Sequence, residues 1–173
     1  MRWLSGFVGF RVRTLVISLL VVYLLIKREK LSPVEKQGIW VTGLVFFLAR
    51  LPFEVIARRQ GFWLYQVEGL TIFGLPIDVM VAMAVAFGSG AALLQYYAKA
   101  RGQEQAVLAQ LGLAVLAVLY DLSGAAMYGY LTIQSAGLFF KLTTFVVLTL
   151  LSGHFFSWFI RRFAEDAVGN EEV

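Results

Sequence analysis

The chain has 173 residues, of which 60% are hydrophobic and only 15% are charged. A water-soluble domain carries about 25% charged residues, so this composition excludes an ordinary soluble domain and predicts a chain that lies in lipid. The net charge of +4 is assigned to Lys and Arg at membrane edges and not to a nucleic-acid surface, so no nucleic-acid partner is expected. Cysteine is absent, which excludes disulfides, thiolate catalysis and Cys-ligated metals.

Several apolar segments are long enough to cross a membrane, for which a helix needs about 20 residues. We therefore predict an all-α, multi-pass transmembrane bundle of about five helices, integral to a prokaryotic cell membrane. Residues 1–163 would form one membrane domain, and residues 164–173 a short polar tail. The spans are expected at about 3–26, 37–57, 76–98, 105–130 and 137–160.

The second span has a clear start. Ser32, Pro33 and Glu35 occupy the N-cap, N1 and N3 positions of a capping box. Gly61 is suited to the position just beyond the helix end. Residues 60–71 are rich in aromatics, which is typical of a loop at a membrane interface.

Small residues recur at four-residue spacing in the third span, at Ala84, Gly88 and Ala92. Such faces let helix backbones approach closely in lipid. They predict close helix packing, either within the chain or in a homo- or hetero-oligomer.

Five charged residues from four segments fall in one half of the predicted membrane. They are Arg50, Glu54, Asp78, Asp121 and Lys141. A charge at a helix centre costs at least about 2.5–3.5 kcal/mol on insertion scales, so pairing or function is expected. The clustering indicates a site.

Each of these charges also has a structural interpretation. Arg50 and Glu54 are four residues apart on one helix face and can neutralise each other. Asp78 follows Pro76 closely and suits the first turn of a helix. Asp121 is either the structural partner of Arg50 or a functional acid. His154 fits a hydrogen bond between packed helices better than a ligand role, and the dispersed carboxylates indicate no metal site.

One short pattern occurs twice. Leu70-Thr71-Ile72 followed by Gly74-Leu75 is similar to Leu131-Thr132-Ile133 followed by Gly137-Leu138. Each copy precedes a long apolar segment, so the chain can be interpreted as an N-terminal helix followed by two helix-loop-helix repeats.

Trp63-x-Tyr65 and Gly74-Leu75-Pro76-Ile77-Asp78 resemble the first signature of the membrane-bound lycopene cyclase domain of carotenoid pathways. The resemblance implies protonation of a polyene end by a carboxylic acid, ring closure through a carbocation, and loss of a proton. Two departures stand out: the second acidic position of the motif is Val79, and Gly137-Leu138-Phe139-Phe140 replaces the Pro-and-Asn signature of the second half.

The leading hypothesis is thus a lycopene-cyclase-like membrane protein that binds or cyclises a carotenoid or isoprenoid without a cofactor. Its candidate catalytic acids are Asp78, Asp121, Glu68 and Glu54, and its candidate substrate-binding residues are Trp63, Tyr65, Pro76, Arg50, Tyr128 and His154. Two alternatives stay open. One is a small transporter or proton conductor with Arg50, Asp121 and His154 as a relay, and the other is a non-enzymatic subunit of a membrane complex.

Overall fold

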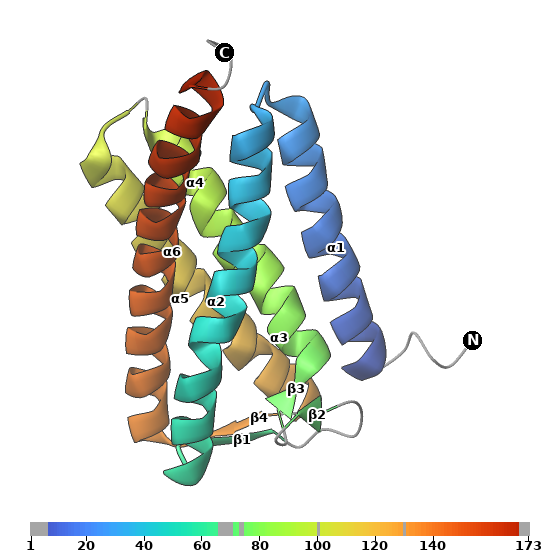
Figure 1. Ribbon diagram of the computed structural model, residues 1–173. Helices are drawn as coiled ribbons and strands as arrows, with labels where there is room; N and C mark the ends of the chain where they lie inside the picture. The colour runs from blue at the N-terminus through green and yellow to red at the C-terminus, as the bar shows by residue number, and fades with distance from the viewer. Residues whose placement is uncertain (1–6, 66–70, 73–74, 100, 130, 170–173) are drawn as a thin grey trace.

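The structure is a computed structural model. It describes the backbone of residues 7–65, 71–72, 75–99, 101–129 and 131–169 and the side chains of residues 12–65, 77–98, 101–129 and 131–163. The described chain is an all-α bundle (Figure 1) with short strands at one end. Its helical elements are α1 (Phe7–Arg28), α2 (Pro33–Arg59), the continuous run α3 (Ile77–Met83), η2 (Ala84–Ser89) and α4 (Gly90–Lys99), then α5 (Gln103–Tyr128) and α6 (Ser135–Gly169).

Four helical segments of the described chain are long and apolar enough to cross a membrane. They are Pro33–Arg59, Ile77–Ala98, Gln103–Tyr128 and Ser135–Phe163. Large apolar side chains point outward from them, among them Leu44, Leu108 and Phe139, as expected where the solvent is lipid. The chain is therefore a multi-pass integral membrane protein. A fifth crossing by α1 stays a prediction.

Helix α1 lies along α3 and η2, and a side-chain hydrogen bond joins it to the bundle near each of its ends. The Tyr120 hydroxyl of α5 donates to Oγ1 of Thr14 at 2.8 Å. The Tyr97 hydroxyl of α4 donates to Oε1 of Glu29 at 3.0 Å. These two bonds hold α1 to the rest of the bundle.

The predicted start of α2 is confirmed. The Ser32 hydroxyl accepts from the Glu35 amide at 3.2 Å, and the Glu35 carboxylate accepts from the Ser32 amide at 2.8 Å. Pro33 is the first helical residue. At the other end Gly61 has a φ of +68°, which favours glycine because it has no Cβ.

The third helical run contains an element that the sequence did not predict, the π-helix η2. It lies where the small-residue face meets α2. A Cβ added at Gly88 would lie 2.6 Å from the Cβ of Phe46, and one at Gly43 would lie 2.5 Å from Oγ of Ser89. Ala84 and Ala92 are buried as well, so this small-residue face serves packing within the chain.

The region 60–71, predicted as a loop, instead contributes strands. Strand β1 (Trp63–Tyr65) pairs antiparallel with β4 (Leu131–Ile133), and β2 (Thr71–Ile72) pairs with β3 (Leu75–Pro76). The ribbon β1–β4 joins the connection after α2 to the connection after α5 (Figure 1). Each copy of the Leu-Thr-Ile pattern thus forms part of a strand, although the two strands have different partners.

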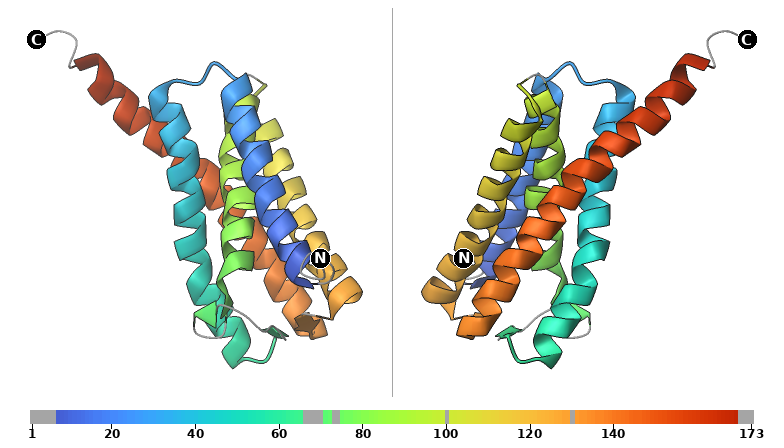
Figure 2. Two further views of the ribbon diagram at one scale, coloured as in Figure 1. Left: turned by 90° about the vertical axis from the view of Figure 1, so that its right-hand side faces the viewer. Right: turned by 90° about the vertical axis from the view of Figure 1, so that its left-hand side faces the viewer.

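Helix α6 is central to the packing because it contacts α2, α4 and α5. It crosses the bundle at a slant, and its C-terminal end projects beyond the other helices (Figure 2). The helix continues to Gly169, so the predicted polar tail that begins at residue 164 is helical over residues 164–169. Residues 164–168 include no glycine or proline and can therefore continue the helix.

Candidate functional site: a buried charge cluster

Arg50 and Glu54 form an ion pair on one face of α2, as predicted. Arg50 Nε donates to Oε1 of Glu54 at 2.7 Å, and Nη2 of the same guanidinium completes the pair. Both side chains are 2% exposed. The spacing of four residues places them one helical turn apart, which makes this contact possible within a single helix.

The second carboxylate oxygen of Glu54 is bound by the ribbon. Trp63 Nε1 donates to Oε2 of Glu54 at 2.8 Å, and the Tyr65 hydroxyl lies 3.3 Å from both carboxylate oxygens. Alternation along β1 places Trp63 and Tyr65 on the same face. The aromatic residues predicted to bind substrate therefore bind the side chain of Glu54.

Asp121 and Lys141 form the second buried ion pair, between α5 and α6. Lys141 Nζ lies 2.7 Å from Oδ2 of Asp121, and the two side chains are 1% and 0% exposed. The suggested structural pairing of Asp121 with Arg50 is thus replaced by a pairing with Lys141. Asp121 is near the end of α5 and Lys141 near the start of α6, so the short connection through β4 brings them to one level.

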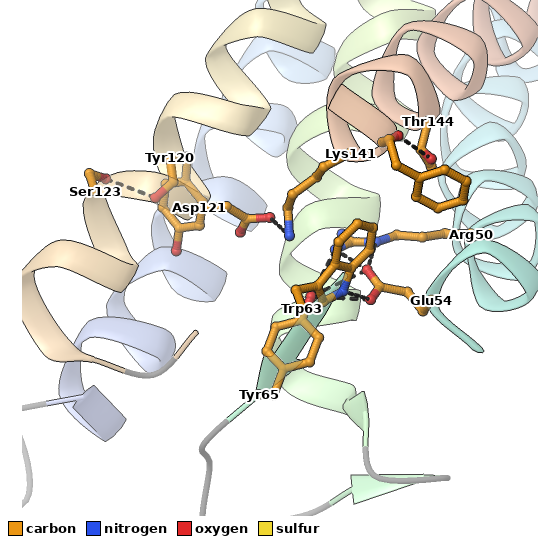
Figure 3. A network of polar contacts seen from close by, with 10 residues as sticks. Arg50, Glu54, Trp63, Tyr65, Tyr120, Asp121, Ser123, Lys141 and Thr144 are labelled. Carbon is orange, nitrogen blue, oxygen red and sulfur yellow. Dashed lines mark hydrogen bonds and ion pairs between the residues drawn. The ribbon is translucent and has the colours of Figure 1, made fainter. Parts of the chain in front are cut away.

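The two ion pairs meet at Trp63 (Figure 3). Lys141 Nζ lies 4.5 Å from the centroid of the Trp63 ring and 5.8 Å from that of Tyr65. A cation at such distances is attracted by the aromatic face. Trp63 therefore donates a hydrogen bond to one pair through its nitrogen and receives the cation of the other pair on its ring.

The resulting charge cluster consists of Arg50, Glu54, Asp121 and Lys141, and its formal charge sums to zero. Breaking a buried pair by removing one partner costs about 3–5 kcal/mol, whereas an intact pair need not stabilise the fold. Neutrality thus makes four buried charges tolerable, but it does not explain why the chain contains them. A cluster of this kind is a candidate functional site.

Aromatic side chains surround the cluster. Phe140 lies 5.2 Å from Phe62 and 5.8 Å from Trp63 between ring centroids, and the Arg50 guanidinium lies 5.0 Å from the centroid of Phe145. Tyr128, a predicted substrate-binding residue at the end of α5, packs with Tyr65 against the same apolar group as Trp63. The cluster is consequently polar in its centre and aromatic at its edge.

Two other predicted residues, Asp78 and Pro76, lie at the same end of the bundle. Asp78 is half-buried in the first turn of α3, and both Asp78 and Asp121 interact electrostatically with Tyr120. Pro76 belongs to β3 and precedes the helix. Glu68 lies outside the described residues.

His154 lies far from the cluster. It is exposed on α6, 13 residues beyond Lys141, which corresponds to about 20 Å along a helix. The buried rings of Phe46, Phe87 and Phe145 belong to an apolar core, in which the centroid of Phe145 lies 6.3 Å from that of Phe46 and 6.0 Å from that of Phe87. Among the described residues, the structure does not bring His154 together with Arg50 and Asp121.

Lys141 is the cluster member missing from the predicted site residues. Its place in an apolar segment indicated a buried charge in the same half of the predicted membrane as the other charges. Its pairing with Asp121 depends on how α5 and α6 pack, which no local pattern specifies.

Comparisons with family models, with curated proteins and with solved structures find no match. The fold and the site thus define the class of protein: a multi-pass helical membrane protein with a neutral, buried charge cluster at one end of its bundle.

Proposed function

We propose that the protein binds a linear isoprenoid or carotenoid from the bilayer and cyclises it by acid-initiated chemistry. Support comes from one observation above all. Carboxylates from three helical elements, Glu54, Asp78 and Asp121, are gathered at the end of the bundle where Trp63 and Tyr65 also lie. An apolar substrate that reaches this end would meet acids and aromatic faces together.

The contacts of the three carboxylates favour different roles. Glu54 accepts from Arg50, Trp63 and Tyr65, so it is arranged as an anion that holds the ribbon in place. Asp121 is bound to Lys141 and suits the acceptance of a proton late in the reaction. Asp78 is then the proposed proton donor, as the resemblance to the lycopene cyclase domain implies.

The proposed reaction needs no cofactor. The proton of the Asp78 carboxylic acid adds to a terminal double bond of the polyene and leaves a tertiary carbocation. An internal double bond attacks this cation and closes the ring. Loss of a proton from a carbon beside the new cation restores a double bond, and an aromatic surround stabilises the cation in between.

Lipid-side cavities support an apolar ligand. One of about 330 Å³ lies between α1, α4 and α5, with Ile17, Leu93 and Leu113 among its lining residues. Another of about 220 Å³ lies between α2 and the third helical run, with Trp40, Phe47 and Val85 among its lining residues. Their predominantly apolar lining suits hydrocarbon chains.

The alternatives have less support. A proton relay would have to connect the cluster with His154 past the apolar layer of Phe46, Phe87 and Phe145. A subunit that docks through its small-residue face would need the surface that Gly88 already uses against Phe46. The isoprenoid proposal uses the cluster and the aromatic side chains around it. The two lateral cavities contain none of these residues in their lining and support only the binding of a hydrocarbon chain.

The test is pigment chromatography of membranes from a lycopene-accumulating host that expresses the chain. We expect cyclised product with the parent protein and with Glu104→Gln, a control at an exposed position, and linear lycopene with Asp78→Asn. Unchanged lycopene with the parent, once the protein is shown in the membrane, would refute cyclisation of this substrate. Product formation by Asp78→Asn would refute the role of Asp78.

A further inference from the structure

A second polar site lies at the end of the bundle opposite the strands. A cavity of about 450 Å³ opens between the start of α2, the end of α4, the start of α5 and the later part of α6. In Figure 1 this is the end where α1 connects to α2 and where α6 leaves the bundle. Of the residues first predicted to bind the substrate of cyclisation, His154 alone is among its lining residues, and His154 lies far from the charge cluster.

Three glutamine side chains form a hydrogen-bonded row that leads into this cavity. Gln110 Nε2 donates to Oε1 of Gln95 at 2.9 Å, and Gln95 Nε2 donates to Oε1 of Gln103 at 3.3 Å. Gln110 and Gln95 are buried, whereas Gln103 is exposed. The row therefore runs from the packed interior to the cavity.

At the buried end of this row, Gln110 packs closely against helix α6. A Cβ added at Gly153 on α6 would collide with the amide of Gln110. A bond between Gln110 and Gln95 is sufficient to join α5 to α4 in lipid. The continuation to Gln103 is not needed for that purpose, and it leaves the Gln103 amide nitrogen as a donor at the cavity.

The other residues that line the cavity form apolar walls and a rim whose charges sum to zero. Tyr96, Phe156 and Ile160 provide the walls, and His154 stands at the rim with Glu35 and Arg161. The charges of Glu35 and Arg161 offset each other, and Glu35 already accepts from the Ser32 amide. A net-neutral site lined by amides and an imidazole suits an uncharged oxygen-bearing group better than a phosphate, which usually binds where positive charge is in excess.

We propose that this cavity binds the uncharged, oxygen-bearing ring of a membrane-soluble molecule. Carbonyl or hydroxyl oxygens of the ring accept hydrogen bonds from Gln103 and His154, and the ring itself lies between Tyr96 and Phe156. The hydrocarbon part of the molecule extends towards the lipid. This site does not depend on the proposed cyclisation.

Calorimetric titration of the full chain in lipid nanodiscs tests the site, with empty nanodiscs as the blank. The probes are decyl-1,4-benzoquinone, decylbenzene, which lacks the oxygens, and decyl phosphate, which is anionic. We expect saturable binding of the quinone alone. Equal binding of decylbenzene, or tighter binding of decyl phosphate, would overturn the proposal.

Exposed residues allow matched variants that preserve the fold. His154→Phe and Gln103→Leu each remove one hydrogen bond to the ring and should weaken quinone binding by about tenfold. Gln103→Leu also removes the bond that Gln103 accepts from Gln95. Gln105→Leu changes another exposed glutamine of α5 outside the cavity and should leave the affinity unchanged. Full affinity in both cavity variants, or an equal loss in the control, would overturn the assignment. The pigment test of cyclisation, repeated with Gln103→Leu, should give unchanged product.

Discussion

The indole nitrogen of Trp63 lies 2.8 Å from Oε2 of Glu54 and donates to it, although one residue belongs to a strand and the other to a membrane-spanning helix. The bond fixes β1 beneath α2 and aims the ring of Trp63 at Lys141. One side chain thus joins the two ion pairs of the charge cluster.

Trp63→Phe removes the donor but keeps an aromatic ring. We expect the free energy of unfolding to fall by about 1–3 kcal/mol because Oε2 of the buried Glu54 carboxylate loses its shorter hydrogen bond and keeps only the longer one from Tyr65. Denaturation in mixed micelles, followed by circular dichroism, measures the change. Trp158→Phe, at a half-exposed position, is the control and should have little effect. Equal stabilities of the two variants would contradict the bond's importance.

The Arg50–Glu54 pair predicts an unusual order of stabilities. Glu54→Leu alone leaves a buried guanidinium without its carboxylate and should cost about 3–5 kcal/mol. The double variant Arg50→Met with Glu54→Leu removes both charges and should be more stable than Glu54→Leu. The same unfolding assay gives the order. A double variant less stable than the single one would show that Arg50 stabilises the fold through other contacts.

Glycine packing predicts opposite effects of one substitution at two helix positions. Gly88→Ala places a methyl group against Phe46 and the α-carbon of Gly43, so we expect a loss of about 1–3 kcal/mol through overpacking. Gly112→Ala has no atom within 4 Å of the added carbon and should raise stability by up to about 1 kcal/mol through helix propensity. Similar effects at both positions would contradict the close approach of α2 and η2.

The ribbon can be tested by cross-linking, because the chain has no cysteine of its own. Leu64 and Thr132 are direct partners in the register of β1 and β4. The double variant Leu64→Cys with Thr132→Cys should form a disulfide under mild oxidation, seen as a faster band on a non-reducing gel. Leu64→Cys paired with Ser123→Cys should not. Failure of the first pair to cross-link would contradict the register.

The helical bundle could be predicted from the sequence because a 20-residue apolar run, a capping box and a charge within an apolar segment are local signals. The capping box at Ser32 and the pairing of Arg50 with Glu54 lie within one helix, so spacing alone predicted them. The partner of Asp121 was missed because Lys141 belongs to another helix, and the choice between Arg50 and Lys141 depends on how the helices pack.

Three other features could not be predicted from local sequence signals, for related reasons. Strands β1 and β4 are too short to show alternation, and each depends on a partner from a distant connection. The π-helix has no sequence pattern of its own and occurs where Gly43 and Gly88 bring two helices together. The polar cavity was missed because its glutamines come from two helices, although His154 had been noted.

The arrangement of the two ion pairs has a consequence for biosynthesis. Arg50 and Glu54 emerge from the ribosome within one helical turn of each other, so α2 can enter the bilayer with its charges already matched. Asp121 and Lys141 arrive later on separate helices, and each finds its partner only when α5 and α6 come together. Strand β1 likewise can pair only after β4 has been synthesised. The cluster is therefore complete only when α6 has been inserted beside α5.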